Sequence, residues 1–403
     1  MKILIVADVT ASRLTGGASR VLRAQVDGLA SRGHDAIVLV KGLPHDSTLE
    51  PVRLPEGAVE LQVQWKGGRG PFGFIQLRRN CRKRLAGLLQ EWQPELLVIQ
   101  QPLLAGGIVS HPDLQRVPVL YVCHSFAFEE YFTRESCIRP LRSLGAALLK
   151  YEEGRLFKRS DRIVVLSQYT RQKLEETYSI DQDVIIIPGG ADSAFHPVSS
   201  DERESLRNRF GMKGVSFLTV RNLVPRTGVD LLVDAFKLLH DRRSEAELWI
   251  AGKGPLESEI RGKIQEYGLD GSVRMLGFVP DEILPDLYRA ADCFVLPTLF
   301  LEGFGLVTVE ALACGTPVVA TPVGANMGVV GGWRKDAVVD SADPSSLSSG
   351  MDYMRELIQN DADRLRRSCA DYGSRFTWDI HVDRLEEELL KLKEERTGLS
   401  GQS

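Results

Sequence analysis

The sequence predicts an α/β protein made of two successive, doubly wound domains, each built on a parallel sheet. Short apolar runs of strand type alternate with helix-like segments along the chain, a pattern typical of βαβ units. With 403 residues, the chain is long enough for two domains of about 190 residues, each able to bury a full core. A glycine-containing turn follows a strand in each half, at the place where open parallel sheets bind ligands.

The first domain is expected to span residues 1–190. It opens with a strand at 2–7, a loop to Gly16-Gly17, and a helix that ends at Gly33. This unit places the two glycines at the first strand-to-helix turn. Further strands are predicted at 36–40, 95–100, 118–123, 162–166 and 184–188, before a polar segment to about 214 that we interpret as an interdomain linker.

The second domain is expected to span residues 191–377. Its predicted strands are 215–220, 246–251, 273–276, 293–296 and 318–320, and its helices are 229–240, 256–267, 283–290 and 306–313. One long charged helix is predicted from Trp378 onward.

Composition indicates an ordinary globular protein. Hydrophobic residues make up 43% and charged residues 26%, and no apolar run approaches the roughly 18 residues of a membrane span. We therefore expect a cytoplasmic protein, neither secreted nor membrane-spanning. The scattered cysteines form no C-x-x-C pair and are expected to be buried, reduced thiols: Cys81, Cys123, Cys137, Cys293, Cys314 and Cys369.

Charge is distributed unevenly between the two halves. Residues 1–200 carry 25 Lys and Arg against 21 Asp and Glu, which leaves 25 against 33 for the rest of the chain. Residues 65–84 contain no acid, and their basic side chains lie among aromatic ones such as Trp65 and Phe72. This stretch suits a solvated basic helix, an anionic membrane or lipid-linked acceptor, or nucleic acid.

The strongest functional signal is the stretch 297–324, PTLFLEGFGLVTVEALACGTPVVATPVG. A strand, a glycine-rich turn and a helix start follow one another, so the free N–H groups of Phe304, Gly305, Leu306 and Val307 form an anion site suited to phosphate. Glu302 precedes that site, and Glu310 lies about 9 Å along the helix axis. Carboxylates accept hydrogen bonds from paired sugar hydroxyls. The predicted ligand is a sugar, a diphosphate and a ribose in a row.

A second candidate side chain is His124, which ends the strand at 118–123. A histidine at the carboxyl end of a strand in a doubly wound sheet points into the ligand crevice. The other six histidines show no metal-ligand spacing.

These motifs resemble the family-four (group 1) retaining glycosyltransferases, which have the GT-B fold. The resemblance runs from Gly16-Gly17 through LVPRTGVDLLVDAF, WIAGKGP and LGFVP to EGFGLVTVE, where Glu302 and Glu310 form the donor-binding E-x7-E. It implies two Rossmann-like domains facing across a cleft, with the C-terminal helix 378–403 joined to the first. It also implies metal-independent, cofactor-free and retaining transfer from a UDP- or GDP-type sugar to an acceptor hydroxyl.

The family assigns roles to the matching residues. His124 touches and polarises the transferred sugar, Glu302 binds its hydroxyls and Glu310 holds the ribose. Gly16 and Gly17 face the donor phosphates and the acceptor, and the base lies near the backbone of 277–279. The resemblance favours a membrane over nucleic acid as the partner of residues 65–84. It suggests a glycan or lipid-linked acceptor in cell-envelope polysaccharide or lipopolysaccharide synthesis.

One departure from the family concerns its phosphate-binding arginine and lysine. In the run 221–228, RNLVPRTG, Asn222 and Thr227 stand at those two positions, and an arginine precedes each. A diphosphate at a helix start needs compensating positive charge. We hypothesise that Arg221 or Arg226 supplies it, with Arg226 the better candidate. A second departure is the run 325–328, where the family often has Gly-Ile-Pro-Glu, and it suggests a different specificity.

Two other interpretations remain open. The departures at Asn222 and Thr227 are compatible with a non-catalytic nucleotide-sugar-binding protein, and a phosphorylase-like enzyme of the same fold would need a lysine bound to pyridoxal phosphate. Two D-x-D runs, 181–183 and 361–363, are interpreted as a turn and a helix start rather than metal sites.

Overall fold

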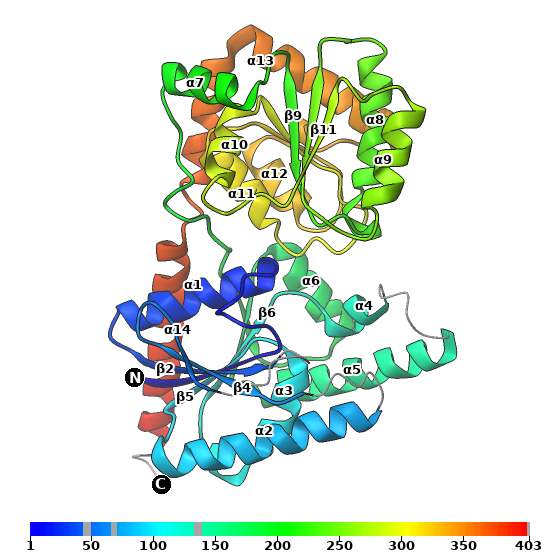
Figure 1. Ribbon diagram of the computed structural model, residues 1–403. Helices are drawn as coiled ribbons and strands as arrows, with labels where there is room; N and C mark the ends of the chain where they lie inside the picture. The colour runs from blue at the N-terminus through cyan, green and yellow to red at the C-terminus, as the bar shows by residue number, and fades with distance from the viewer. Residues whose placement is uncertain (43–49, 66–70, 133–138, 401–403) are drawn as a thin grey trace. The chain divides into compact units, whose positions relative to one another are not determined.

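The computed structural model describes residues 1–42, 50–65, 71–132 and 139–400 (Figure 1). The chain forms two compact units. Unit 1 comprises Met1–Pro188 and Trp378–Ser403, and unit 2 comprises Gly189–Thr377. Each unit contains a largely parallel sheet with helices packed against it, which confirms the predicted α/β class.

The sheet of unit 1 has eight strands in the order β3-β4-β2-β1-β5-β6-β7-β8. All neighbours pair in parallel except β3 and β4. The strands are β1 Lys2–Ala7, β2 Asp35–Lys41, β3 Val52–Arg53, β4 Val59–Val63, β5 Leu96–Ile99, β6 Val119–Cys123, β7 Arg162–Val165 and β8 Asp183–Ile186. Strands β3 and β4 were not predicted. β3 has only two residues, and β4 buries two polar side chains, Glu60 and Gln62, that interrupt its apolar pattern.

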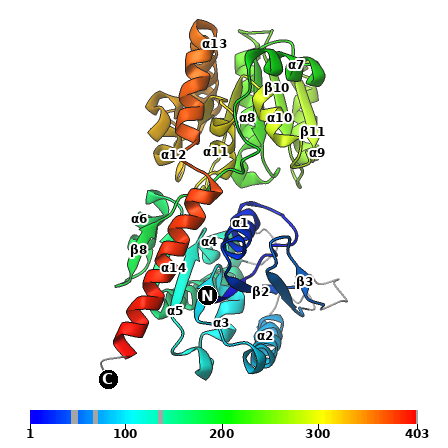
Figure 2. The ribbon, with the colours of Figure 1, turned by 90° about the vertical axis from the view of Figure 1, so that its left-hand side faces the viewer.

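Helices cover both faces of this sheet. They are α1 Gly17–Ser31, α2 Pro71–Glu91, α3 Pro102–Ile108, α4 Ala127–Phe132, α5 Arg139–Arg159, α6 Gln168–Thr177 and α14 Trp378–Ser400. Helices α2, α3 and α5 lie on one face and α1 and α14 on the other (Figure 2). Their buried side chains form two hydrophobic clusters, one on each face of the sheet. A Cβ on Gly28 would lie only 2.6 Å from Val382, so this glycine permits α1 and α14 to pack closely. The long charged helix therefore belongs to unit 1.

Unit 2 has five parallel strands in the order β11-β10-β9-β12-β13. They are β9 Ser216–Val220, β10 Glu247–Ala251, β11 Val273–Gly277, β12 Cys293–Leu296 and β13 Val318–Ala320. The helices are α7 Ser200–Phe210, α8 Val229–His240, α9 Glu257–Glu266, α10 Leu284–Ala290, α11 Leu306–Ala313, α12 Asn326–Trp333 and α13 Pro344–Gly373. The strand order reverses between β9 and β12, and such a switch point opens a crevice at the carboxyl ends of the strands.

Helix α7 lies inside the segment that we expected to be a polar linker. Ser199 and Glu202 form a capping box at its start, and Gly211 ends it in the left-handed conformation. None of its side chains is fully buried, which explains why no apolar periodicity indicated a helix.

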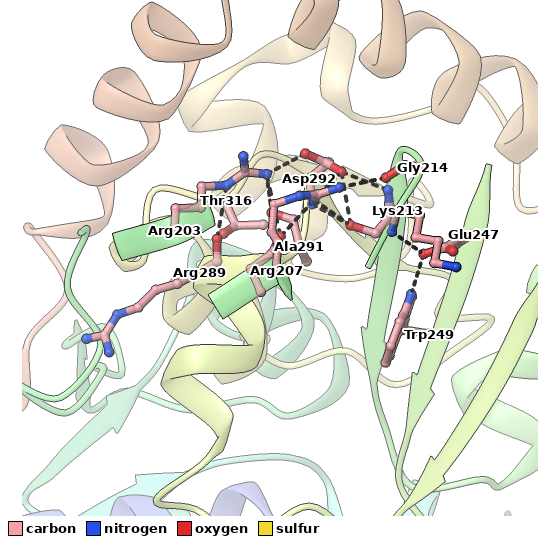
Figure 3. Close-up of polar contacts among 12 residues, drawn as sticks. Arg203, Arg207, Lys213, Gly214, Glu247, Trp249, Arg289, Ala291, Asp292 and Thr316 are labelled. Atoms are coloured by element: carbon pink, nitrogen blue, oxygen red, sulfur yellow. Dashed lines mark hydrogen bonds and ion pairs between the residues drawn. The ribbon is translucent and has the colours of Figure 1, made fainter. Parts of the chain in front are cut away.

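Asp292, just before β12, anchors α7 to the sheet (Figure 3). Arg203 and Arg207 both form ion pairs with its carboxylate, that of Arg207 at 2.7 Å, and the Ser216 backbone N–H donates to it at 2.8 Å. Burial alone would raise the pKa of Asp292, but the two guanidinium groups outweigh that effect and lower it.

Within the described residues, five cysteines are buried free thiols, as predicted, and Cys137 lies outside those residues. No helix in this part of the chain is long and apolar enough to cross a bilayer.

Candidate functional site

The loop between β12 and α11 lies at the switch point of the unit 2 sheet. Gly305 is the N-cap of α11 with a φ of 86°, in the left-handed region that glycine enters without strain. Leu301 also has a positive φ, 61°, which is costly for a residue with a branched side chain. The half-buried Leu306 and Val307 begin α11, so the first turn of the helix, where backbone N–H groups lack intrahelical partners, lies in this loop.

Glu302 is held within this loop by a buried ion pair. Its Oε2 lies 2.8 Å from Nη2 of Arg221, the residue that follows β9. Thr298 donates its hydroxyl to the same oxygen at 2.8 Å, and Arg221 also donates to Thr298 Oγ1 at 3.1 Å. The side chains of Arg221 and Glu302 are only 8% and 9% exposed. The end of β9 and the loop after β12 are thus joined at the switch point by an ion pair in which Arg221 neutralises the charge of the Glu302 carboxylate.

Two glycines allow backbone segments to reach this loop. Gly324 has a φ of 60°, and a Cβ there would lie 2.2 Å from the carbonyl oxygen of Glu302. Gly228 has a φ of 66°, and a Cβ there would lie 2.0 Å from the carbonyl oxygen of Pro297. Any other residue at either place would displace the loop that carries Glu302.

The other residues of the departing run, 221–228, lie beside the same loop. Arg226 donates from Nη1 to the Leu301 carbonyl at 3.4 Å, and its own carbonyl accepts from the Leu299 N–H at 2.9 Å. The hydroxyl of Thr227 is buried and lies 2.7 Å from the carbonyl oxygens of Asn222 and Val224, so it is bound within its own turn.

Glu310 lies one helical turn into α11 and is also buried, at 5% exposure. The hydroxyl of Tyr288 on α10 donates to its Oε2 at 3.1 Å. Sequence reasoning missed this tyrosine because it lies 22 residues earlier and carries no motif. A second carboxylate is therefore positioned beyond the start of α11, as expected.

In unit 1, His124 follows β6 and Gln100 follows β5. His124 Nε2 lies 2.5 Å from Gln100 Oε1, and Gln100 Nε2 donates to Gln25 Oε1 at 2.5 Å. Gln25 Nε2 lies 2.8 Å from His381 Nε2, and His381 Nδ1 lies 2.7 Å from the carbonyl oxygen of Pro188. Burial lowers the pKa of His124, and that of His381, to about 4, so both rings are neutral near pH 7. The sequence indicated His124 alone.

The loop after β1 carries Gly16 and Gly17. Its preceding residues are fixed by Glu60 of β4, whose carboxylate accepts from the N–H groups of Ala11 and Ser12 at 2.7 and 3.0 Å. The Ser19 hydroxyl donates to the Gly16 carbonyl, and Gly17 is the first residue of α1. Glu60 alternates with the apolar residues Val59, Leu61 and Val63 of β4, and that alternation is the signal that would have identified it.

The predicted site residues are thus divided between the units. Unit 1 holds His124, Gly16 and Gly17. Unit 2 brings together Glu302, Arg221 and Arg226 around the loop before α11, with Phe304, Gly305, Leu306, Val307 and Glu310 continuing from it and Asn222 and Thr227 on the adjacent turn. No cluster of three or more metal-ligating side chains occurs in the residues that the structure describes.

The basic stretch 65–84 is partly engaged by the protein itself. Residues 66–70 lie outside the described residues. Trp65 packs against the core under the Lys41 ammonium group, and Arg78 forms an ion pair with Glu152 at 3.0 Å. Arg79 and Lys83 of α2 are exposed.

The two units with parallel sheets correspond to the GT-B fold of glycosyltransferases, and two family models match the chain. The model "Glycosyltransferase Family 4" matches residues 15–195, and "Glycosyl transferases group 1" matches residues 201–376. The chain belongs to the family-four, group 1 glycosyltransferases.

Curated relatives and solved structures show the same likeness. The chain is 33% identical over 255 residues to mannosylfructose-phosphate synthase of Agrobacterium fabrum, covering 60% of this chain and 54% of that protein. It is 30% identical over 288 residues to D-inositol 3-phosphate glycosyltransferase of Corynebacterium jeikeium, covering 68% of this chain and 66% of that protein. The matched part thus spans about half to two thirds of these relatives.

Solved structures also match nearly the whole chain. Sucrose-phosphate synthase of Thermosynechococcus elongatus superposes with a TM-score of 0.80 at 20% identity, covering 97% of this chain and 99% of that one. Anabaena HepE in complex with UDP has a TM-score of 0.76 at 20% identity, covering 97% and 100%. At this level of identity, the likeness shows the fold.

Proposed function

We propose that this protein transfers a glycosyl group from a nucleoside diphosphate sugar to an acceptor hydroxyl, with retention of anomeric configuration. The observation that carries the proposal is the start of α11, an anion site with a buried carboxylate, Glu302 or Glu310, on each side. This order suits a sugar, a diphosphate and a ribose. Family membership and the UDP bound to the structurally similar HepE support the same ligand class.

In this proposal, each end of the donor meets a different kind of group. The N–H groups at the start of α11 and the Arg226 guanidinium stabilise the diphosphate, because they place positive charge where the leaving group becomes more negative. Glu302 and Glu310 accept hydrogen bonds from the sugar and ribose hydroxyls. His124 orients the transferred sugar, while Gly16 and Gly17 allow close approach of the phosphates and the acceptor.

The proposed reaction breaks the bond between the anomeric carbon and the phosphate oxygen. The acceptor oxygen forms the new bond on the same face, and its proton passes to the departing phosphate oxygen. The protein contributes positioning and stabilisation of the leaving charge rather than a nucleophile. We also propose that the reaction needs neither a metal nor a cofactor, since the α11 start and Arg226 supply the positive charge.

The acceptor is proposed to be an envelope glycan or a lipid-linked sugar, used by a cytoplasmic protein at the inner face of the membrane. Exposed Arg79 and Lys83 support contact between residues 65–84 and anionic lipid. Flotation with phosphatidylglycerol vesicles tests this contact: it should fall in an Arg79→Ala/Lys83→Ala double variant, whereas equal flotation of both proteins would contradict it.

The donor site is tested by thermal stabilisation of the purified protein with a panel of nucleoside diphosphate sugars, followed by hydrolysis of any donor that stabilises it. We expect one donor class to stabilise the wild type and Glu266→Ala, a control at an exposed acid of α9, but not Glu310→Ala. Stabilisation without turnover would favour a non-catalytic nucleotide-sugar-binding protein. No stabilisation by any donor would contradict the site.

A further inference from the structure

The hydrogen-bonded row His124, Gln100, Gln25 and His381 ends on a group that can only accept. That group is the carbonyl oxygen of Pro188, 2.7 Å from His381 Nδ1. A carbonyl oxygen has no hydrogen to donate, so His381 Nδ1 carries one. All members of the row belong to unit 1.

The polarity of every other bond in the row follows from this end. The His381 ring is buried, and burial together with the nearby Arg384 charge keeps it neutral, so its Nε2 has a lone pair. Gln25 must then donate its Nε2 hydrogen to that lone pair, which leaves Gln25 Oε1 to accept from Gln100 Nε2. Gln100 Oε1 can then only accept a hydrogen bond, and its partner in the row is His124 Nε2, which must donate. His124 therefore carries its hydrogen on Nε2.

The opposite nitrogen of His124 is left as an acceptor. Burial holds the ring in its neutral form, so Nδ1 has a lone pair. This atom is buried and has no hydrogen-bond partner among the residues that the structure describes. A buried acceptor without a partner destabilises the fold, because the atom has lost its hydrogen bonds to water. A ligand that donates a hydrogen bond there would recover that cost.

We propose that Gln100, Gln25 and His381 are positioning residues that fix His124 as its Nε2–H tautomer, so that Nδ1 accepts a hydrogen bond from a ligand hydroxyl. A hydroxyl can donate to this lone pair, whereas a fully ionised phosphate oxygen cannot. His124 thus selects for the sugar part of the ligand rather than its phosphates. This last step rests on the proposed function, while the tautomer itself does not.

The three positioning residues come from separate elements. Gln25 is on α1, Gln100 follows β5 at the switch point of the sheet, and His381 is on α14. Gln25, Gln100 and His381 are at most 1% exposed. Pro188 is the residue at which the chain leaves unit 1, and α14 begins where it returns. The availability of the His124 Nδ1 lone pair therefore depends on how Pro188 and the start of α14 pack within unit 1.

The test is long-range proton–nitrogen NMR of the full-length protein labelled with nitrogen-15 in histidine, between pH 5.5 and 8. His124→Asn and His381→Asn identify the two signals. We expect His124 with its hydrogen on Nε2 and His381 with its hydrogen on Nδ1, each in roughly tenfold or greater excess. A hydrogen on Nδ1 of His124, or a ring that becomes charged in this range, would overturn the proposal.

Gln100→Glu should reverse the direction of hydrogen-bond donation along the row, and it therefore tests the proposal more directly. A carboxylate has no hydrogen for Gln25, so the Gln25 amide must turn and present its oxygen to His381. His381 is then expected to become doubly protonated at pH 7. Gln101→Glu is the matched control, because Gln101 Oε1 accepts from the N–H groups of Asp8 and Val9 outside the row. An unchanged His381 signal in Gln100→Glu would overturn the proposal.

Gln25→Leu removes the Gln25 amide from the hydrogen-bonded row and provides an independent test if Gln100→Glu does not fold. The Gln100 amide then loses its fixed direction, and His124 should show both tautomers. A single Nε2–H signal of His124 in this variant would contradict the proposal that the row fixes the His124 tautomer.

In the wild type, a donor that stabilises the protein should shift the His124 Nδ1 signal toward the hydrogen-bonded range. An unmoved signal would reject the hydroxyl contact alone, since stabilisation by the donor is measured separately.

Discussion

Arg221 and Glu302 form a buried ion pair, with Nη2 and Oε2 2.8 Å apart, between the ends of two strands that flank the switch point of unit 2. The sequence placed Arg221 one position before the arginine expected in this family. The structure shows that this guanidinium compensates the carboxylate proposed to bind the sugar. Arg221 and Arg226 therefore have different environments, and substitutions can separate their contributions.

Arg221→Ala is expected to lower both stability and activity. The change leaves Glu302 buried without its partner, which typically costs about 3–5 kcal/mol. The free energy of unfolding and kcat/KM for the donor should both fall, kcat/KM by roughly 100-fold.

Arg226→Ala should lower turnover with little change in the free energy of unfolding. Comparable activity of Arg226→Ala and wild type would remove Arg226 from the diphosphate site.

Tyr288→Phe is expected to weaken donor binding. Its hydroxyl donates to Glu310 at 3.1 Å, and a hydrogen bond of this kind contributes about 1 kcal/mol, more to a charged group. KM for the donor should rise roughly five-fold with little change in kcat. Tyr267→Phe is the control, since its hydroxyl donates to Asp234 on the far helix pair α8 and α9. An equal rise in KM in both variants would argue against a role for Tyr288 at Glu310.

The two buried histidines should make stability fall in mild acid. Burial lowers the pKa of His124 and of His381 from 6.5 to about 4, so the unfolded chain binds more protons between these values. Their contribution is therefore fully present above pH 6.5 and is lost progressively as the pH falls to 4, by about 3 kcal/mol for each ring. Urea unfolding across this range should show a shallower pH dependence in His381→Gln than in the wild type. Parallel curves would contradict neutral burial of His381.

Asp292→Asn is expected to destabilise unit 2. The change leaves Arg203 and Arg207 without their shared carboxylate and should lower the free energy of unfolding by about 3 kcal/mol at pH 7. Because the pKa of Asp292 is lowered in the fold, its contribution is present above about 3.8 and is lost as the pH falls through the folded value. The difference between variant and wild type in urea unfolding should therefore shrink as the pH falls below about 3.8. Asp270→Asn, at an exposed position, is the control.

Removal of divalent cations should leave the reaction unchanged. The proposed charge compensation comes from the α11 start and Arg226. Turnover of a stabilising donor should be equal before and after treatment with EDTA, and added magnesium should not increase it. Loss of turnover in EDTA that magnesium restores would contradict the metal-independent mechanism.

The sequence predicted features that depend on local patterns. The alternation of strands and helices and the glycine-rich start of α11 are visible within short windows, and these elements lie where they were expected. Strand β4 was missed because Glu60 and Gln62 are buried in it, and α7 because it buries no full apolar face. A pattern of apolar residues cannot indicate elements that lack one.

Hydrogen-bond and ion-pair partners that lie far apart in the chain could not be predicted from the sequence. Arg221 and Glu302 are separated by 81 positions, and Gln25 and His381 by 356. No local spacing links such residues, because the sheet order brings them together. The sequence could therefore propose His124 and Glu302 as site residues, but not the groups that fix their charge and orientation.

The most direct test of glycosyl transfer is a time course by proton NMR of the purified protein with the donor that stabilises it, with an acceptor or with water alone. We predict release of the nucleoside diphosphate and first appearance of the sugar in the anomeric configuration of the donor, with both absent in Glu302→Gln. Inverted sugar would contradict retention. Failure of every donor to turn over would contradict the proposal that this protein is an active transferase.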